Sequence, residues 1–316
     1  MPEADPPFDV LCVGLACVDL VLSVPHHPAP DEKIRAASRL IAPGGPAAVA
    51  AAQVARLGGR SAFAGLLGDP ARDPFAPLLR AAFANEGIDT TALLATPGHE
   101  TPLAAILVKP DACRAIVSHR PATQSISQSL IDEIRPAVPS FPRARVVLAD
   151  GHRPEWSDAL AAHADTMGAP LVLDAGSWTE PVRALAPRAG HLVASETCAR
   201  AALGGEDPAA AEPAALRRAL RARADAFVVV TLGPRGLVWS SPSSSGAQPA
   251  FRIVAVDTTG AGDAFHGAYA LGLARGLESD ARLRLASAAG ALACTRAGAW
   301  TALADTREIT GLLALP

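Results

Sequence analysis

The sequence of 316 residues is poor in lysine and in aromatic side chains and carries no excess of positive charge. Its 28 basic residues are outnumbered by 31 acidic ones, which gives a net charge of −3, and Lys33 and Lys109 are its only lysines. A chain without a positive field is not expected to bind nucleic acid or an anionic membrane surface. A small molecule is the expected partner.

The five cysteines, at positions 12, 17, 113, 198 and 294, are odd in number and include no C-x-x-C pair. A disulfide framework and a zinc knuckle are therefore not indicated, and a reducing compartment fits best. The first residues, MPEADPPFDV, carry acids and prolines where a signal peptide needs a basic and then an apolar stretch. No apolar run reaches the roughly 18 residues of a membrane span. We expect a cytoplasmic protein.

Apolar runs typical of strands alternate with longer runs typical of helices. The expected strands are 10–16, 145–150, 170–176, 226–233 and 251–256, and the expected helices are 46–57, 73–86, 155–167, 212–224 and 262–275. This alternation predicts an α/β fold with a mostly parallel central sheet covered by helices on both faces. Several strands end in Asp or Gly, at the carboxyl edge where such sheets bind ligands.

Two stretches, 19–42 and 100–121, break this alternation and resemble short strands joined by Pro- and Asp-marked turns. We expect them to pair into a small β lid over the pocket. The remaining segments, 1–18, 43–99 and 122–316, are expected to form one α/β domain. The polar segment 241–250 is expected to be a surface connection between two strands.

One short stretch, DTTGAGDAFHGAYALGLARG (257–276), carries the clearest chemical signal. Gly260, Ala261 and Gly262 allow a tight turn whose N–H groups a ligand can approach, directly before a helical run. The start of a helix attracts anions, and a phosphate is the obvious one. Asp263 would repel a phosphate that only had to bind there. Its presence suggests a base that accepts a proton from a hydroxyl attacking the phosphorus.

Other interpretations of this stretch fit less well. A dinucleotide fingerprint would need a third glycine where Phe265 stands, and a Walker loop would need G-K-[ST] after the glycines. A glycine turn followed by an aspartate that caps its helix is common and remains open from these residues alone. His266 lies on roughly the same helix face as Asp263, but a helix histidine packed against a neighbouring element is commoner than a functional one, so it is left out of the expected site.

The segment VDTTGAGDAFHGA (256–268) closely resembles the C-terminal signature of the ribokinase-like (PfkB) carbohydrate kinases. PGGPAAVAAAQVARLGG (43–59) resembles the N-terminal glycine signature of that family, TLGPRG (231–236) its nucleotide loop, and ACTRAGAWTALAD (293–305) its closing loop. These segments span the chain in the family's order. Within the family, the sequence looks nearest to the sulfofructose kinase branch.

The resemblance implies a ribokinase-like three-layer α/β/α fold with a small β lid, and transfer of the γ-phosphoryl group of Mg-ATP to a sugar hydroxyl. It implies Asp263 as catalytic base and the amides of Gly260, Ala261 and Gly262 as anion hole. The other positions that match family residues are Asp19, Gly44 and Gly45 for the sugar, Thr231, Gly233 and Gly236 with Gly262 for the nucleotide, and Asp257 and Thr259 for a monovalent cation such as K⁺.

Three departures from the family pattern bear on the substrate and on magnesium. Val49 stands where ribokinases place an Asn that binds sugar, so plain ribose is not the expected acceptor. The N-x-x-E segment appears as SETC, so magnesium would be held through the ATP phosphates and water, or near Ser195 and Glu196. Two histidine–arginine pairs could recognise an anionic end group, because Arg presents a planar fork of donors. They are His119 with Arg120, and His152 with Arg153.

The function expected from the sequence is an ATP-dependent sugar kinase whose acceptor is a small sugar or sugar derivative, with a ketose that carries an anionic group as one form. The alternatives are a nucleoside kinase of the same family and a non-catalytic sugar- or nucleotide-binding homologue. Aromatic residues make up only 4% of the chain, which disfavours a base-stacking pocket. The resemblance also implies a homodimer formed through the lid.

Overall fold

A computed structural model describes residues 7–96, 99–111, 113–119 and 141–314. Its strands are β1 Phe8–Val13, β2 Cys17–Ser23, β3 Ser38–Gly44, β4 Ser61–Gly68, β5 Leu93–Thr96, β6 Leu103–Val108, β7 Arg114–His119, β8 Ala144–Ala149, β9 Leu171–Ala175, β10 His191–Ser195, β11 Phe227–Thr231, β12 Leu237–Ser240 and β13 Ser245–Gln248. Its α-helices are α1 Pro46–Arg56, α2 Ala76–Asn85, α4 Ser157–Met167, α5 Glu180–Leu185, α6 Glu196–Ala202, α7 Pro213–Ala219, α8 Ala261–Ala274, α9 Ser279–Ala293 and α10 Thr306–Leu313.

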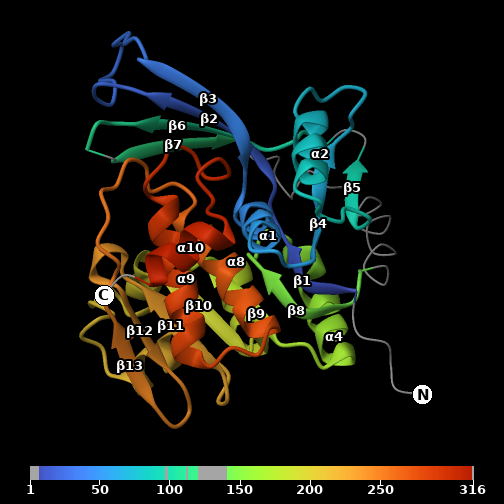
Figure 1. Cartoon of the computed structure of the whole chain (residues 1–316), viewed down its shortest axis with the longest axis vertical. Coiled ribbons are helices and arrows are strands. Elements are labelled where there is room, and N and C mark those ends of the chain that lie inside the picture. The colour runs from blue at the N-terminus through green and yellow to red at the C-terminus, as the bar shows by residue number, and fades with distance from the viewer. Residues whose placement is uncertain (1–6, 97–98, 112, 120–140, 315–316) are drawn as a thin grey trace.

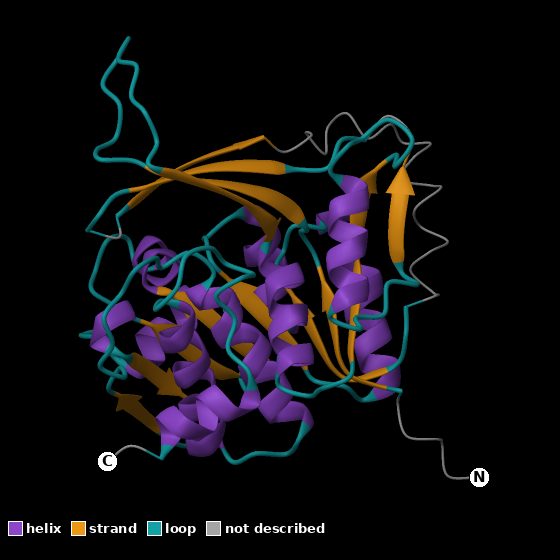
Figure 2. Ribbon diagram, turned by 45° about the horizontal axis from the view of Figure 1, so that its top comes forward, coloured by secondary structure: helices purple, strands orange, loops and turns teal. Residues whose placement is uncertain are grey.

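Within these described residues the larger sheet has nine strands in the order β13-β12-β11-β10-β9-β8-β1-β4-β5. All neighbours pair in parallel except β11 with β12 and β12 with β13. Helices cover both faces (Figures 1 and 2). The predicted α/β/α fold with a mostly parallel sheet is therefore confirmed.

Alternate side chains of each central strand enter two separate cores, as the two-residue period of a strand requires. In β1, Val10 and Cys12 pack with α1, α8 and α9, whereas Leu11 and Val13 pack with α4 and α6 on the other face. Gly267 lets α8 approach α1 closely, since a Cβ there would lie 2.4 Å from the carbonyl oxygen of Ala50. This packing fixes the first turn of α8 beside the carboxyl ends of the central strands.

A second sheet has the strand order β3-β2-β6-β7 and lies across one end of the larger layers (Figure 1). Its strands overlap the two segments expected to form the lid, 19–42 and 100–121, although β2 begins at Cys17 and β3 ends at Gly44. Whether this sheet moves as a lid stays a prediction.

Three local expectations differ from the structure. Residues 251–256 form no strand, because they leave the sheet after β13 and cross toward α8, with Val254 85% exposed. The segment 241–250 is not only a connection, since it contains the edge strand β13. The helix expected at 212–224 is shorter and ends at Ala219, near the left-handed backbone of Arg221 (φ 51°).

Among the described residues, none of the helices combines the length and the apolar composition that a membrane span requires.

Candidate active site

The loop before α8 and the first turn of that helix form the expected anion site. Gly260 has φ 78°, and a Cβ there would lie 2.5 Å from the Cβ of Ala299, so both backbone and space require glycine. The helix begins at Ala261, and the N–H groups of a first turn have no partner within their helix. The amides of Gly260, Ala261 and Gly262 therefore lie where the positive end of α8 favours a phosphate.

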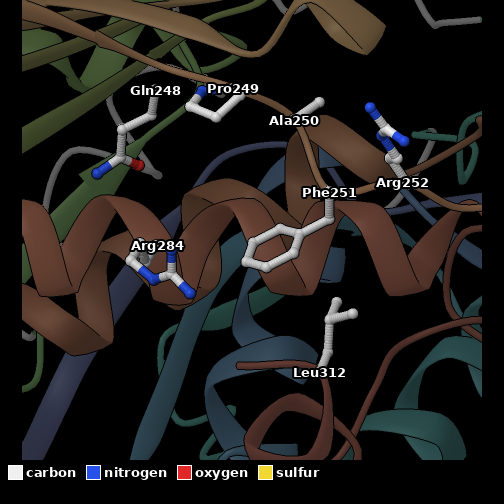
Figure 3. Close-up of a pocket in the computed structure, with 7 residues that line it drawn as sticks. All are labelled: Gln248, Pro249, Ala250, Phe251, Arg252, Arg284 and Leu312. Atoms are coloured by element: carbon white, nitrogen blue, oxygen red, sulfur yellow. The ribbon is translucent and has the colours of Figure 1, made fainter. Parts of the chain in front are cut away.

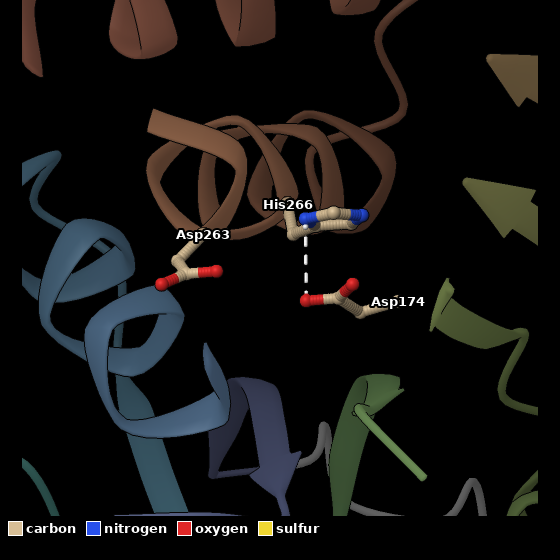
Figure 4. Close-up of side chains that lie close together, drawn as sticks. All are labelled: Asp174, Asp263 and His266. Carbon is tan, nitrogen blue, oxygen red and sulfur yellow. Dashed lines mark ion pairs between the residues drawn. The ribbon is translucent and has the colours of Figure 1, made fainter. Parts of the chain in front are cut away.

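Asp263 lies in this first turn, half-buried, and its carboxylate faces Asp174 of β9 (Figure 4). One ligand atom from each of Asp174, Asp263 and His266 lies within 4.8 Å of the others. Burial, followed by the negative charge of Asp174, raises the pKa of Asp263 to about 7. A carboxylate with a pKa near the working pH is suited to accept a proton, and the role of Asp263 as base stays a prediction.

The residues expected to bind sugar lie together where β3 ends and α1 begins, beside the start of β2. Asp19 of β2 is 5% exposed, accepts a hydrogen bond from Cys17 Sγ at 3.3 Å, and has its pKa raised to about 6 chiefly by burial. Gly44 leaves room for that carboxylate, because a Cβ would lie 2.2 Å from Asp19 Oδ2. Gly45, with φ 98°, is the N-cap of α1. The three residues form one corner of the site.

Asp150 also lies in this region, and sequence reasoning assigned it no role. Its Oδ2 accepts from the amides of Leu15 (2.8 Å) and Ala47 (3.2 Å), and its Oδ1 accepts from the amide of His152 (2.9 Å). This buried carboxylate thus joins the end of β1, the start of α1 and the loop after β8. Its position at the end of an apolar strand was the available signal.

The residues expected on the nucleotide side follow β10 and β11, where Ser195 and Thr231 are neighbours in register. Gly233 has φ 58° and Gly236 has φ 89°, and a Cβ on Gly236 would lie 2.0 Å from the carbonyl oxygen of Gln248. The turn TLGPRG therefore needs its glycines for its shape. This turn and the anion loop both lie beyond the carboxyl ends of the central strands, where such sheets bind ligands.

The residues considered for magnesium are engaged by other groups. The hydroxyl of Ser195 donates to the carbonyl of Gly176 at 2.8 Å and accepts from the amide of Cys198 at 3.0 Å. Glu196 pairs with Arg200 at 2.9 Å and Arg235 at 3.0 Å, and these arginines lower the pKa of its carboxyl group. Neither side chain is arranged to ligate a metal ion in this structure, so their cofactor role stays a prediction.

Asp257 connects the loop before α8 with the loop after α9 through hydrogen bonds. Its Oδ1 accepts from the amide of Thr259 at 2.9 Å and its Oδ2 from the amide of Gly298 at 2.8 Å, with the side chain 1% exposed. The hydroxyl of Thr259 is buried and has no hydrogen bond to any described residue. The role of Asp257 and Thr259 in holding K⁺ stays a prediction, and the bonds to turn amides show that Asp257 shapes the loop.

Arg114, on the second sheet, contacts the loop that precedes α8. Arg114, on β7, donates through Nη1 to the hydroxyl of Thr258, one residue before Thr259. The contact joins residues 144 positions apart in the chain. Sequence reasoning missed Arg114, because no motif distinguishes it from the other arginines of an Arg-rich chain.

The cations expected to bind an anionic end group are dispersed. Arg120 lies outside the described residues, and His119 pairs with Glu100 at 3.0 Å with its side chain 62% exposed. Arg153 is 8% exposed, 3.3 Å from Glu155 and over the ring of Trp156. His152 contacts Asp150 through its amide. Among the described members of the two pairs, those of the second pair lie next to Asp150 in the chain, with the amide of His152 bonded to it.

A surface hollow lies elsewhere, between the segment after β13 and helices α9 and α10 (Figure 3). Arg284 lies 5.5 Å from the ring of Phe251, and Leu312 closes the other side. None of the residues that line it belongs to the cluster around Asp263. We therefore assign the chemistry to the ends of the central strands and not to this hollow.

Residues 8–306 match the pfkB family of carbohydrate kinases. The chain belongs to this family. It is 29% identical over 303 residues to the ribokinase of Haemophilus influenzae, covering 94% of this chain and 95% of that protein. It is 30% identical over 285 residues to the fructokinase of Solanum tuberosum, covering 87% of each. The crystal structure of the ribokinase of Thermotoga maritima has a TM-score of 0.79 at 25% identity, covering 97% of this chain and 99% of that one.

As a pfkB-family protein, this enzyme is a carbohydrate kinase and transfers a phosphoryl group to an alcohol. These named relatives are a fructokinase and ribokinases. Kinship with the sulfofructose kinase branch is not shown by them and stays a prediction.

Proposed function

We propose that this kinase transfers the γ-phosphoryl group of ATP to a hydroxyl of a small sugar, with Asp263 as the general base. The observation that supports the proposal is the position of the Asp263 carboxylate, whose pKa is raised to about 7 by burial, in the same helical turn as the amides of Ala261 and Gly262. We propose that the proton acceptor and the phosphate site thus lie within one turn of α8. Proximity of this kind supplies much of the rate enhancement of phosphoryl transfer.

In the reaction, Asp19 would hold the sugar so that one hydroxyl points to Asp263. The O–H bond breaks as its proton passes to an Asp263 oxygen, the sugar oxygen forms a bond to the γ-phosphorus, and the bond from that phosphorus to the β–γ bridging oxygen breaks to release ADP. The amides of Gly260, Ala261 and Gly262 stabilise the charge on the phosphoryl oxygens. We propose that Arg114, which donates a hydrogen bond to the hydroxyl of Thr258 in the same loop, neutralises part of this charge.

Magnesium, when bound with ATP, would neutralise phosphate charge as a Lewis acid. Neither Ser195 nor Glu196 is free to hold it, so we propose that it is carried by the ATP phosphates and by water. The proposed K⁺ site at Asp257 and the carbonyl of Thr259 is supported by the burial of both residues, and the hydroxyl of Thr259 has no hydrogen bond to a described residue. Activity measured with K⁺ replaced by a large organic cation tests it, since a kinase indifferent to that change has no such site.

We propose a small sugar as acceptor, and a sugar with an anionic group as its finer form. The latter is supported by Arg153, whose Nε is buried and has no hydrogen bond to a described residue, close to the backbone that Asp150 holds. Release of ADP should be measured with neutral ketoses and aldoses, with their phosphates and sulfonates, and with nucleosides. A turnover confined to nucleosides, or absent with every acceptor, would contradict the sugar kinase assignment.

We further propose that the second sheet forms a lid and also pairs two copies of the chain. Three large apolar side chains on its two edge strands are exposed: Ile41 of β3 by 48%, and Ile116 and Val117 of β7 by 50% and 71%. Ile41 and Val117 lie on the same face of the sheet, because both are in register with Leu20 and Ala105. Exposed apolar side chains on one face favour association with another surface. Sedimentation of the wild type and of Val117→Lys tests the idea: a dimer that the substitution converts to monomer is expected, and a wild-type monomer at all concentrations contradicts it.

A further inference from the structure

Two buried ionisable side chains, Asp174 and His266, lie next to Asp263. Neither is used in the mechanism proposed above. Asp174 is at the end of β9 and is 4% exposed, and His266 is on α8, three residues after Asp263, and is also 4% exposed. Figure 4 shows the carboxylates of Asp174 and Asp263 turned toward each other, with the imidazole of His266 beside them. A pair of buried carboxylates so close together is costly when both are ionised.

His266 is held through both of its ring nitrogens. Nδ1 lies 2.6 Å from the carbonyl oxygen of Gly262 and 3.3 Å from Asp174 Oδ2, and Nε2 lies 3.2 Å from the carbonyl oxygen of Val193. A neutral ring can donate through only one nitrogen, so a doubly protonated ring satisfies these contacts better. With both nitrogens directed at carbonyl oxygens, the ring is not oriented to bind a metal ion. Burial lowers the pKa of His266, while the carbonyl of Val193 and the charge of Asp263 oppose that effect.

Asp174 has an incompletely paired carboxylate. Its Oδ2 is buried, receives no hydrogen bond from any described residue, and lies 3.3 Å from Nδ1 of His266, which is charged only when its ring is doubly protonated. Burial, and then the charge of Asp150, raise the pKa of Asp174 well above its ordinary value. The backbone N–H of Gly176 donates a hydrogen bond to this carboxylate and opposes the rise.

The groups that face Asp263 come from four elements. Asp174 on β9, Asp19 on β2 and Asp150 after β8 are acidic, and His266 on α8 itself is the only basic one among those that act on it in the described structure. Negative neighbours favour the protonated carboxyl group, and a positive neighbour favours the carboxylate.

We propose that Asp174 and His266 are positioning residues that act on the catalytic carboxylate in opposite directions, Asp174 favouring its protonated form and His266 its ionised form. This inference rests on the proposed role of Asp263 as base. The balance keeps Asp263 able both to take the proton of the sugar hydroxyl and to release it after turnover near neutral pH. Removal of either neighbour should therefore move the ionisation of the base without removing the base itself.

The dependence of kcat on pH in the wild type, Asp174→Asn and His266→Gln provides the test. The acid limb should move to lower pH in Asp174→Asn and to higher pH in His266→Gln, by about one pH unit each. The same two substitutions on α4, Asp165→Asn and His163→Gln, are matched controls and should leave the limb in place. The proposal is overturned if the acid limbs of both variants remain at the wild-type pH, or if both limbs move in the same direction. A raised KM for Mg-ATP in Asp174→Asn with an unmoved limb also overturns it, in favour of a nucleotide-binding role.

A second measurement needs neither turnover nor acceptor. The pKa of His266 can be followed by ¹⁵N NMR, with its signals assigned by their loss in His266→Gln. It should be lower in Asp263→Asn than in the wild type, because removing a nearby negative charge disfavours the imidazolium form. Equal pKa values in the two proteins overturn the coupling even if phosphoryl transfer is normal. A wild type that transfers no phosphoryl group refutes the proposed function, while this NMR shift still decides whether the two side chains interact.

Discussion

The guanidinium of Arg114 on β7 donates a hydrogen bond to the hydroxyl of Thr258, and so connects the second sheet to the loop that precedes α8. The contact places a cation beside the amides expected to hold phosphate. The sheet that carries Asp19, proposed to bind the sugar, thus also contacts the loop proposed to bind phosphate. If both proposals hold, sugar binding and phosphate binding are connected through one sheet.

Replacing Arg114 with Gln is expected to lower kcat/KM for ATP by about 10- to 100-fold, because a charge-assisted hydrogen bond contributes about 1.5–3 kcal/mol. Steady-state ADP release at varied ATP concentration measures the loss. Arg39→Gln, an exposed arginine on β3 of the same sheet, is the control and should change little. Equal kinetics in both variants would remove Arg114 from the site.

Replacing Gly44 with Ala is expected to weaken the acceptor site selectively. The added Cβ would lie 2.2 Å from Asp19 Oδ2 and must displace that carboxylate. We expect kcat/KM for the sugar to fall by about 10- to 100-fold, the range for a lost hydrogen bond to a charged group, and ATP binding to stay normal. Gly311→Ala, on α10 with no atom within 4 Å of the new Cβ, is the control. A variant with unchanged acceptor kinetics would show that Asp19 does not bind the sugar.

Replacing Gly260 with Ala should distort the anion loop. An alanine at φ 78° is strained, and its Cβ would lie 2.5 Å from the Cβ of Ala299. We expect kcat to fall by about 10²–10³, the effect of losing an oriented oxyanion donor. Gly87→Ala is the control, because Gly87 also has a left-handed backbone (φ 67°) but no atom within 4 Å of an added Cβ. It shows the effect of backbone strain without a distorted anion loop. If the two variants retain equal activity, the amides of this loop are not part of the phosphate site.

The sequence was sufficient to predict the fold because its signals are local and repeated. Apolar runs such as 145–150 and 170–176 fix the buried strands, and the glycines around Asp263 fix the turn before α8. The segment 251–256 was misassigned, since an apolar run predicts burial and cannot show that no neighbouring strand is available. Arg114, Asp150 and Asp174 were missed for a related reason: their roles depend on contacts between distant segments, which spacing along the chain does not reveal.

The raised pKa of Asp263 predicts a stability cost that depends on pH. Its pKa is about 7 in the folded protein against an ordinary 3.8, so the folded state binds more protons between these values. Stability should therefore fall as pH rises from about 4 to about 7 and stay low above that. Asp263→Asn removes the cost and should be more stable than the wild type at pH 8, by up to about 4 kcal/mol. In thermal unfolding, the difference in Tm between Asp263→Asn and the wild type should become smaller as the pH is lowered toward 4. A difference in Tm that does not change with pH contradicts the pKa assigned to Asp263.

The central claim is that Asp263 removes the proton from the attacking hydroxyl. Its most direct test is coupled ADP release with a productive sugar acceptor, compared among the wild type, Asp263→Asn and Asp280→Asn, the last an exposed aspartate in the first turn of the neighbouring helix α9. The account predicts that Asp263→Asn binds ATP normally and loses about 10²–10⁴ in kcat, roughly 3–5 kcal/mol of barrier, while Asp280→Asn matches the wild type. A folded Asp263→Asn enzyme with near wild-type turnover would contradict it.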